Sequence, residues 1–225
     1  MILFHQFFDQ TSSTLTYLLA DPLSGDAVII DSVKEHLGAY LTFLQEQELQ
    51  LAWVLETHVH ADHVTGAAGL REMTGARSAV SAVGGVLCAD RQLIDGDTIV
   101  FGSEVIRVIP TPGHTPGCVT YHWRDRIFCG DVLELGGCGQ AVDETDAGLM
   151  YDSVRKRIYS LPGETLVFPG HDYAGRTVST VAEERQRNAA FTGLARDRFI
   201  EHMAHLEKRP VLAPDTDPPN QALVI

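Results

Sequence analysis

Short apolar runs separated by turn residues occupy most of the chain, and this pattern predicts many short strands. Residues 15–19 and 27–30 are apolar and flank the turn-rich segment 21–26, which indicates a β-hairpin. Residues 51–55 are apolar throughout, which is typical of a buried strand. Further strands are predicted at 78–83 and 165–168, and two more hairpins are predicted from the strands 98–101 with 105–110 and 119–123 with 126–129.

Apolar residues recur at helical spacing in other segments. Residues 33–44 place apolar side chains on one helical face and lead into the strand at 51–55. The segment 208–225 contains four prolines and is expected to be an extended, proline-rich tail of a single domain that covers 1–225. The remaining helices are predicted at 66–74, which Gly75 ends, and at 150–161, 177–188 and 195–206.

A cluster of metal-capable side chains lies within six residues, shortly after the predicted strand 51–55. Imidazole and carboxylate together suit zinc, iron, manganese or nickel, and the His-x-His spacing lets two rings converge on one ion. The carboxylate and the last histidine then bind a second ion or hold the rings that bind the first. The members of the cluster are His58, His60, Asp62 and His63.

Three further metal-capable side chains each follow a glycine beyond an apolar run: His114, Asp131 and His171. His114 lies between two Pro-Gly pairs in 111–117, and these rigid turns fix the position of its ring. One such residue alone is typical of a capped or surface position. Three of them beside the cluster at 58–63 predict a metal site.

Composition narrows the class of protein. At 225 residues and 44% hydrophobic content, the chain is long enough for one large core or two fused half-cores. Seventeen basic and thirty acidic residues give a net charge of -13, which disfavours binding to nucleic acid or to anionic lipid. No apolar run is long enough to cross a bilayer. Residues 1–8 lack the features of a signal peptide and the four cysteines are dispersed, so a cytoplasmic location is expected.

The order of these residues resembles the metallo-β-lactamase superfamily over nearly the whole chain. The resemblance implies an α+β fold, the αββα sandwich, in which metal ligands gather on loops at one edge of the sheets. In members with two metal ions, the first site would match His58, His60 and His114, and the second Asp62, His63 and His171, with Asp131 bridging.

Within the superfamily, the stretches 57–66, 111–121, 137–139 and 169–187 resemble the persulfide dioxygenases, also called ethylmalonic encephalopathy protein-like sulfur dioxygenases. The resemblance implies a homodimer that oxidises a low-molecular-weight thiol persulfide, glutathione persulfide above all, with O2 and water to sulfite and thiol. It implies one Fe(2+) per chain, held by His58, His114 and Asp131. The residues that then orient ligands, water or substrate by hydrogen bonds are His60, Asp62, His63 and His171.

The same resemblance marks three candidate catalytic residues, Tyr173, Asp172 and Cys138. Tyr173 either donates a hydrogen bond toward substrate or oxygen, or packs as an amphipathic residue at the pocket rim. Cys138 either contacts the substrate or fills a small buried space. Persulfide dioxygenases commonly carry arginine after Gly-Cys-Gly, whereas this chain has Gln140, which leaves the organic part of the persulfide open.

A second enzyme class uses the same seven ligand residues. Glyoxalase II-like hydrolases bind two metal ions, here two Zn(2+), which generate hydroxide for attack on a thioester. Those hydrolases usually carry a longer C-terminal helical region with basic residues, so the dioxygenase is the primary prediction and the hydrolase the alternative. A non-catalytic metal-binding module is a third interpretation, but the diiron proteins of that kind replace a histidine of the cluster by a carboxylate.

Overall fold

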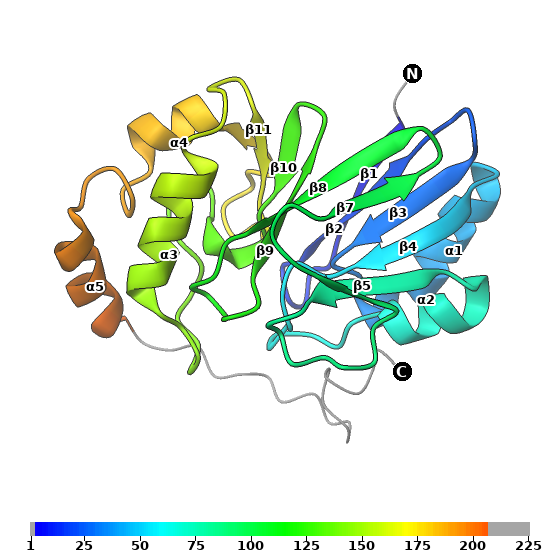
Figure 1. The fold of residues 1–225 in the computed structure, drawn as a ribbon, viewed down its shortest axis with the longest axis horizontal. Helices are drawn as coiled ribbons and strands as arrows, with labels where there is room; N and C mark the ends of the chain where they lie inside the picture. Colours follow the sequence, from blue (N-terminus) through cyan, green and yellow to red (C-terminus); the bar gives the residue numbers. More distant parts are fainter. Residues whose placement is uncertain (1–2, 207–225) are drawn as a thin grey trace.

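Residues 3–206, which the computed structural model describes, form two six-stranded sheets packed face to face with helices on both outer surfaces (Figure 1). This αββα sandwich confirms the predicted fold class. The strands of the first sheet are, in spatial order, β1 (Leu3–Phe8), β2 (Leu15–Ala20), β3 (Asp26–Ile30), β4 (Gln50–Leu55), β5 (Arg77–Ser81) and β6 (Arg91–Leu93). From β1 to β3 neighbouring strands are antiparallel, and from β3 to β6 they are parallel.

The second sheet begins as an antiparallel meander. Its strands are, in chain order, β7 (Thr98–Phe101), β8 (Glu104–Pro110), β9 (Val119–Trp123), β10 (Arg126–Phe128), β11 (Leu166–Phe168) and β12 (Ser179–Thr180). Neighbours from β7 to β10 are antiparallel, β10 and β11 are parallel, and β12 is antiparallel to β11. The spatial order of these strands is the same as their order in the chain.

Helices cover the outer face of each sheet, as Figure 1 shows. The first sheet packs against α1 (Leu37–Glu46), which follows the 3₁₀ turn Lys34–His36, and α2 (Ala67–Thr74). The second sheet packs against α3 (Ala147–Ser153), α4 (Val181–Arg187) and α5 (Arg196–Ala204).

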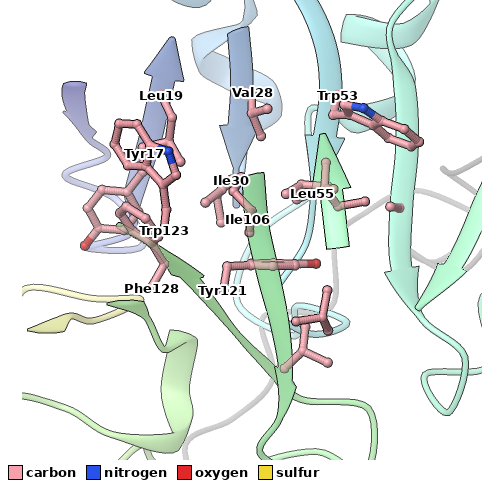
Figure 2. Packing of buried hydrophobic residues seen from close by; sticks show 14 of the residues in the cluster. Tyr17, Leu19, Val28, Ile30, Trp53, Leu55, Ile106, Tyr121, Trp123 and Phe128 are labelled. Carbon is pink, nitrogen blue, oxygen red and sulfur yellow. The ribbon is translucent and has the colours of Figure 1, made fainter. Parts of the chain in front are cut away.

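Side-chain alternation along the strands divides the core into three layers. In β3, Val28 and Ile30 point into the space between the sheets, whereas Ile29 points toward α1 and α2. Figure 2 shows the central layer, in which Ile106 and Tyr121 of the second sheet pack with residues of the first. The continuous apolar runs of the sequence are therefore strands that are buried on both faces.

The chain leaves β3, β4, β8, β10 and β11 at one common edge of the sandwich. The carboxyl ends of β3 and β4 lie side by side because these strands are parallel, and the same is true of β10 and β11. Backbone hydrogen bonds connect the two sheets at this edge, from Leu15 N to Gly170 O and from Val119 N to Thr57 O, both 2.8 Å long. Loops that leave these strands are thereby brought together.

Most predicted elements are confirmed. The three predicted hairpins form, and α2 ends at Gly75, which has a left-handed conformation (φ +73°). Three strands were not predicted, of which β12 lies in a segment predicted to be helical and is described below. β1 carries its apolar residues in two pairs separated by His5 and Gln6 instead of alternating, and β6 has only three residues, so neither carries the periodic signal of a strand.

The helix predicted at 177–188 is wrong at its start. The segment begins as strand β12, which pairs with β11, and helix α4 starts only at Val181. Thr180 separates the two elements because its hydroxyl accepts a hydrogen bond from Glu183 N at 3.1 Å and caps the helix. The helix predicted at 150–161 forms as α3 followed by the π-helical turn Val154–Ile158.

The predicted tail at 208–225 lies outside the described residues. Within residues 3–206, no helix combines the length and the apolar character that crossing a bilayer requires.

A buried carboxylate connects the turns of two hairpins, one from each sheet. Asp21 follows β2 and is 3% exposed. It accepts hydrogen bonds from the Ser103 backbone N–H at 2.7 Å, from the Ser103 hydroxyl at 2.8 Å and from Leu23 N at 2.9 Å. These hydrogen bonds lower the pKa of Asp21 to about 2, so folding stabilises its ionised form.

We expect Asp21→Asn to lower the free energy of unfolding at about pH 6, because an amide oxygen accepts these hydrogen bonds less strongly than a carboxylate. Folding lowers this pKa, so the stabilisation is complete above the pKa of the unfolded chain, about 4, and is lost as the pH falls toward about 2. Urea unfolding at about pH 6 and about pH 3 measures the difference. Asp26→Asn in the same hairpin is the control, and an equal loss of stability at both pH values contradicts the assignment.

Candidate metal centre

A buried carboxylate sets the geometry of His58, the first candidate ligand after β4. Asp31 follows β3 directly, has a left-handed backbone (φ +54°) and is 1% exposed. It accepts hydrogen bonds from the Thr57 backbone N–H at 2.7 Å and from the Thr57 hydroxyl at 2.8 Å. Because this hydroxyl donates to Asp31, it accepts the hydrogen bond from His58 Nδ1 at 2.9 Å. The lone pair of the His58 ring is therefore on Nε2.

His114 is oriented in the same way by a different partner. It lies in the loop between β8 and β9, and its Nδ1 is 3.0 Å from the backbone carbonyl oxygen of Gln140. A carbonyl oxygen only accepts, so Nδ1 carries the proton and Nε2 the lone pair. The Thr145 hydroxyl donates to the backbone carbonyl of His114 at 3.0 Å and holds the loop. Both histidines thus offer Nε2 as a ligand atom.

Asp131 completes a group of three donors. It lies in the short 3₁₀ helix Gly130–Val132 after β10. Its Oδ2 is 3.6 Å from His114 Nε2 and 3.9 Å from His58 Nε2, too far for hydrogen bonds. The three donor atoms lie within 4.8 Å of one another, and His58 Nε2 is buried without a hydrogen-bond partner among residues 3–206. Two imidazole nitrogens and one carboxylate oxygen fit a divalent metal such as iron or zinc.

The other oxygen of Asp131 is held by His171, in the turn after β11. His171 Nδ1 lies 2.8 Å from Asp131 Oδ1, and His171 Nε2 lies 2.8 Å from Asp62 Oδ2. Gly170 permits this contact, because a Cβ at that position would lie 2.3 Å from Asp131 Oδ1. Asp62 Oδ2 is also 3.2 Å from His63 Nδ1. The Asp131 carboxylate therefore joins the three-donor group to the remaining candidates.

His60, in the loop after β4, contacts two buried carboxylates. Its Nε2 is 3.0 Å from Glu56 Oε2 and 3.2 Å from Asp31 Oδ1, and its Nδ1 is 4.0 Å from Asp62 Oδ1. The cluster at 60–63 supplies a second group of three donor atoms within 4.8 Å of one another. The structure therefore brings all seven predicted ligand residues to one edge of the sandwich, in two adjoining groups.

The electrostatics of the three-donor group suit a cation. Burial and the charge of His60 lower the pKa of His58 to about 3, so this ring is neutral near neutral pH. Burial raises the pKa of Asp131, but the charge of His171 and the hydrogen bond with His171 outweigh this effect and lower the pKa well below its usual range. Burial lowers the pKa of His171, but the charge of Asp131 and the hydrogen bonds to Asp131 and Asp62 outweigh this effect and raise the pKa to about 10. Neutral imidazole and ionised carboxylate are the forms that bind metal ions.

The three candidate catalytic residues have different surroundings. The Tyr173 ring is stacked on the His171 ring at 5.3 Å with an interplanar angle of 7°, and it is 42% exposed. The Asp172 carboxylate accepts hydrogen bonds from three backbone amides of the turn that follows it. Cys138 Sγ is 3.5 Å from Met203 Sδ of α5, and burial raises the pKa of the thiol to about 12. Of the three, the Tyr173 ring contacts a ligand candidate, Asp172 stabilises the turn, and Cys138 packs as a neutral thiol.

Sequence analysis did not single out the residues that hold the histidines in place: Asp31, Glu56 and Thr65. The Thr65 hydroxyl donates to Glu56 Oε1 at 2.5 Å and fixes the carboxylate that contacts His60. Asp31 and Glu56 each directly follow an apolar strand, as Asp131 nearly does, but they lack the preceding glycine that marked Asp131.

Comparison with known proteins agrees with this geometry. The model of the metallo-beta-lactamase superfamily matches residues 10–171. The human mitochondrial persulfide dioxygenase ETHE1 is 42% identical over 209 residues, which are 91% of this chain and 82% of the human protein. The crystal structure of ETHE1 from Myxococcus xanthus has a TM-score of 0.95 at 42% identity and covers 99% of this chain and 100% of that one. A hydroxyacylglutathione hydrolase from Cereibacter sphaeroides is 37% identical over 166 residues, 72% of this chain and 64% of the hydrolase.

These matches span the loops that carry the three donors, and they confirm the resemblance that the ligand order predicted. The chain therefore belongs to the metallo-β-lactamase superfamily and, within it, to the family of the persulfide dioxygenases.

Proposed function

We propose that this protein oxidises a low-molecular-weight thiol persulfide with O2. One persulfide, one O2 and one water give one thiol, one sulfite and two protons, so the outer sulfur is oxidised while O2 is reduced. Two relatives named for this activity or family, the human and the Myxococcus proteins, match nearly the full length of the chain and support the reaction class. The three-donor group supports a metal-dependent reaction.

The contrast between two sets of distances supports a single metal ion. His58, His114 and Asp131 face one another at 3.6 and 3.9 Å, which leaves room for an ion between their donor atoms. His171, which would match the second site of a two-metal member, instead has both ring nitrogens 2.8 Å from carboxylate oxygens, those of Asp131 and Asp62, a hydrogen-bonding distance. This difference is the observation on which the proposal of one Fe(2+) per chain depends.

The residues of the chain have distinct parts in the proposed reaction. Fe(2+) held by His58, His114 and Asp131 would supply a centre at which sulfur and O2 meet and exchange electrons. His171 fixes the orientation of the Asp131 carboxylate by its hydrogen bond to Oδ1. Tyr173, exposed and stacked on His171, is proposed to donate a hydrogen bond from its hydroxyl to the substrate.

Glutathione persulfide is the proposed substrate within this class. The homodimer and the cytoplasmic location stay predictions from the sequence. The backbone of Gln140 already serves the site through its hydrogen bond with His114. Arg176 lies 3.0 Å from Glu183 and is exposed, which favours a surface ion pair over the binding of a substrate carboxylate.

Thioester hydrolysis with two Zn(2+) is the second candidate. The observation that favours it is the second donor group at 60–63, which lies within 4.8 Å like the first. The similarity to the Cereibacter hydrolase also favours thioester hydrolysis, but this chain covers only 64% of that protein. The two candidates differ in the number of metal ions and in the consumption of O2.

Metal content and O2 consumption of the purified protein test the proposed reaction directly. After expression with added iron, we expect one iron per chain, and O2 uptake and sulfite formation on addition of glutathione persulfide. Two zinc ions per chain, no O2 uptake and rapid cleavage of a glutathione thioester would instead establish the hydrolase.

Substitutions test the assignment of the three donors. We expect His114→Ala and Asp131→Ala each to reduce retained iron at least about tenfold, because each removes one of only three protein ligands. Metal analysis after gel filtration measures retention, and circular dichroism verifies that the variants are folded.

Cys138→Ala is the matched control, since its thiol packs against Met203 rather than in the donor group. We expect this variant to retain iron at the level of the unmodified protein. Equal iron in all three variants would show that the three-donor group is not the metal site.

A further inference from the structure

A small cavity lies between the loop after β4, which carries His58 and His60, and the end of β5 with the segment that follows it. Its volume is about 20 Å³, and His58 and His60 form part of its wall. The cavity therefore shares a residue with the three-donor group. The apolar part of its wall consists of Val59, Val80, Val86, Gly84 and Gly117.

The apolar wall is tightly built. Val80 and Val86 are 5% and 3% exposed and pack together with Val59. The backbones of Gly84 and Gly117 approach so closely that a Cβ on Gly117 would lie 2.6 Å from Gly84 Cα. The apolar side of the cavity is thus bounded by methyl groups and backbone and has little freedom to widen.

Most polar groups of the wall have hydrogen-bond partners of their own, and His58 Nε2, which has none among residues 3–206, is the atom that we propose to bind the metal ion. Glu56 lies 3.0 Å from His60 Nε2 and accepts from the Thr65 hydroxyl at 2.5 Å. Ser81 Oγ accepts from Val83 N at 3.3 Å. A molecule inside the cavity therefore finds few groups that need a further hydrogen bond, which disfavours an ordered water.

Size and polarity together select the occupant. A volume of about 20 Å³ exceeds the roughly 10–15 Å³ that one water-sized molecule needs, but it is far too small for an organic persulfide. O2 is small and apolar and needs no hydrogen bond, so its transfer from water to an apolar cavity is favourable. The proposed reaction requires O2 beside His58, which is where the cavity lies.

We propose that this cavity between Val59, Val80 and Val86 is a binding site for O2 that supplies the reaction at the adjacent three-donor group. The inference deepens the proposed function and rests on it. The persulfide, which is too large for the cavity, then approaches from the exposed side near Tyr173.

The first test detects O2 in the cavity without any reaction. O2 is paramagnetic and accelerates the relaxation of methyl protons close to it. In protein loaded with zinc, which is diamagnetic, we expect dissolved O2 to accelerate relaxation of the Val59, Val80 and Val86 methyl groups about twofold or more above the control valines. The controls are Val28 and Val54, which are fully buried in the packed core. Equal acceleration at all these valines would overturn the proposal.

The second test fills the cavity. A Cβ on Gly84 would lie 3.7 Å from Val59 Cγ2 and 3.3 Å from Ser81 O, so Gly84→Ala adds a methyl group against the cavity wall with only a small adjustment. We expect the KM for O2 to rise about threefold or more, with the KM for the persulfide and the iron content unchanged, because one methyl group alters binding in an apolar pocket measurably. Gly38→Ala is the control, because the new Cβ in α1 would have no atom within 4 Å apart from its chain neighbours and its own helix backbone.

The two tests separate failure of this inference from failure of the proposed reaction. Unmodified protein that consumes no O2 with a persulfide contradicts the reaction, while the relaxation measurement still decides whether the cavity binds O2. Normal turnover with an unchanged KM for O2 in Gly84→Ala, together with no relaxation effect, overturns the cavity assignment. If Gly84→Ala does not fold, the relaxation measurement on the unmodified protein decides alone.

Discussion

The carboxylate of Asp31 is the interaction on which the candidate centre depends. It is buried at the end of β3 in a left-handed conformation and accepts two hydrogen bonds from Thr57. A buried charge without such partners is costly, so the loop after β4 must place Thr57 against it. Thr57 then determines the tautomer of His58, and the same carboxylate contacts His60. One charge at one strand end therefore organises two histidines.

The direction of the strands explains why residues far apart in the sequence meet. Parallel pairing of β3 with β4 and of β10 with β11 brings four strand exits to one edge, and backbone hydrogen bonds between the sheets hold that edge closed. His171 and Asp131 lie on neighbouring exits, which is why a glycine is needed at position 170. The apolar layer between the sheets (Figure 2) keeps this edge in place without contributing any ligand.

Sequence analysis predicted the sandwich, most strands and every member of both donor groups, but not Asp31 and Glu56, the carboxylates that contact His60. Several histidines at strand ends in one chain are an unusual pattern, whereas carboxylates at strand ends are common. Only the fold shows that Asp31 and Glu56 converge on His60. The same limit explains the start of α4, because the capping hydroxyl of Thr180 is also compatible with a helix that begins earlier. The proposal of one metal ion depends on the difference between 2.8 Å at His171 and 3.6–3.9 Å among the three donors, which no sequence pattern encodes.

The three donors come from both sheets, so metal binding affects the stability of the fold as well as the reaction. His58 follows a strand of the first sheet, whereas His114 and Asp131 follow strands of the second. An ion bound among them is a cross-link that exists only in the folded chain, so each tenfold excess of free metal over its dissociation constant adds about 1.4 kcal/mol to the free energy of unfolding. Scarcity of metal would then reduce the number of molecules that escape proteolysis as well as their activity.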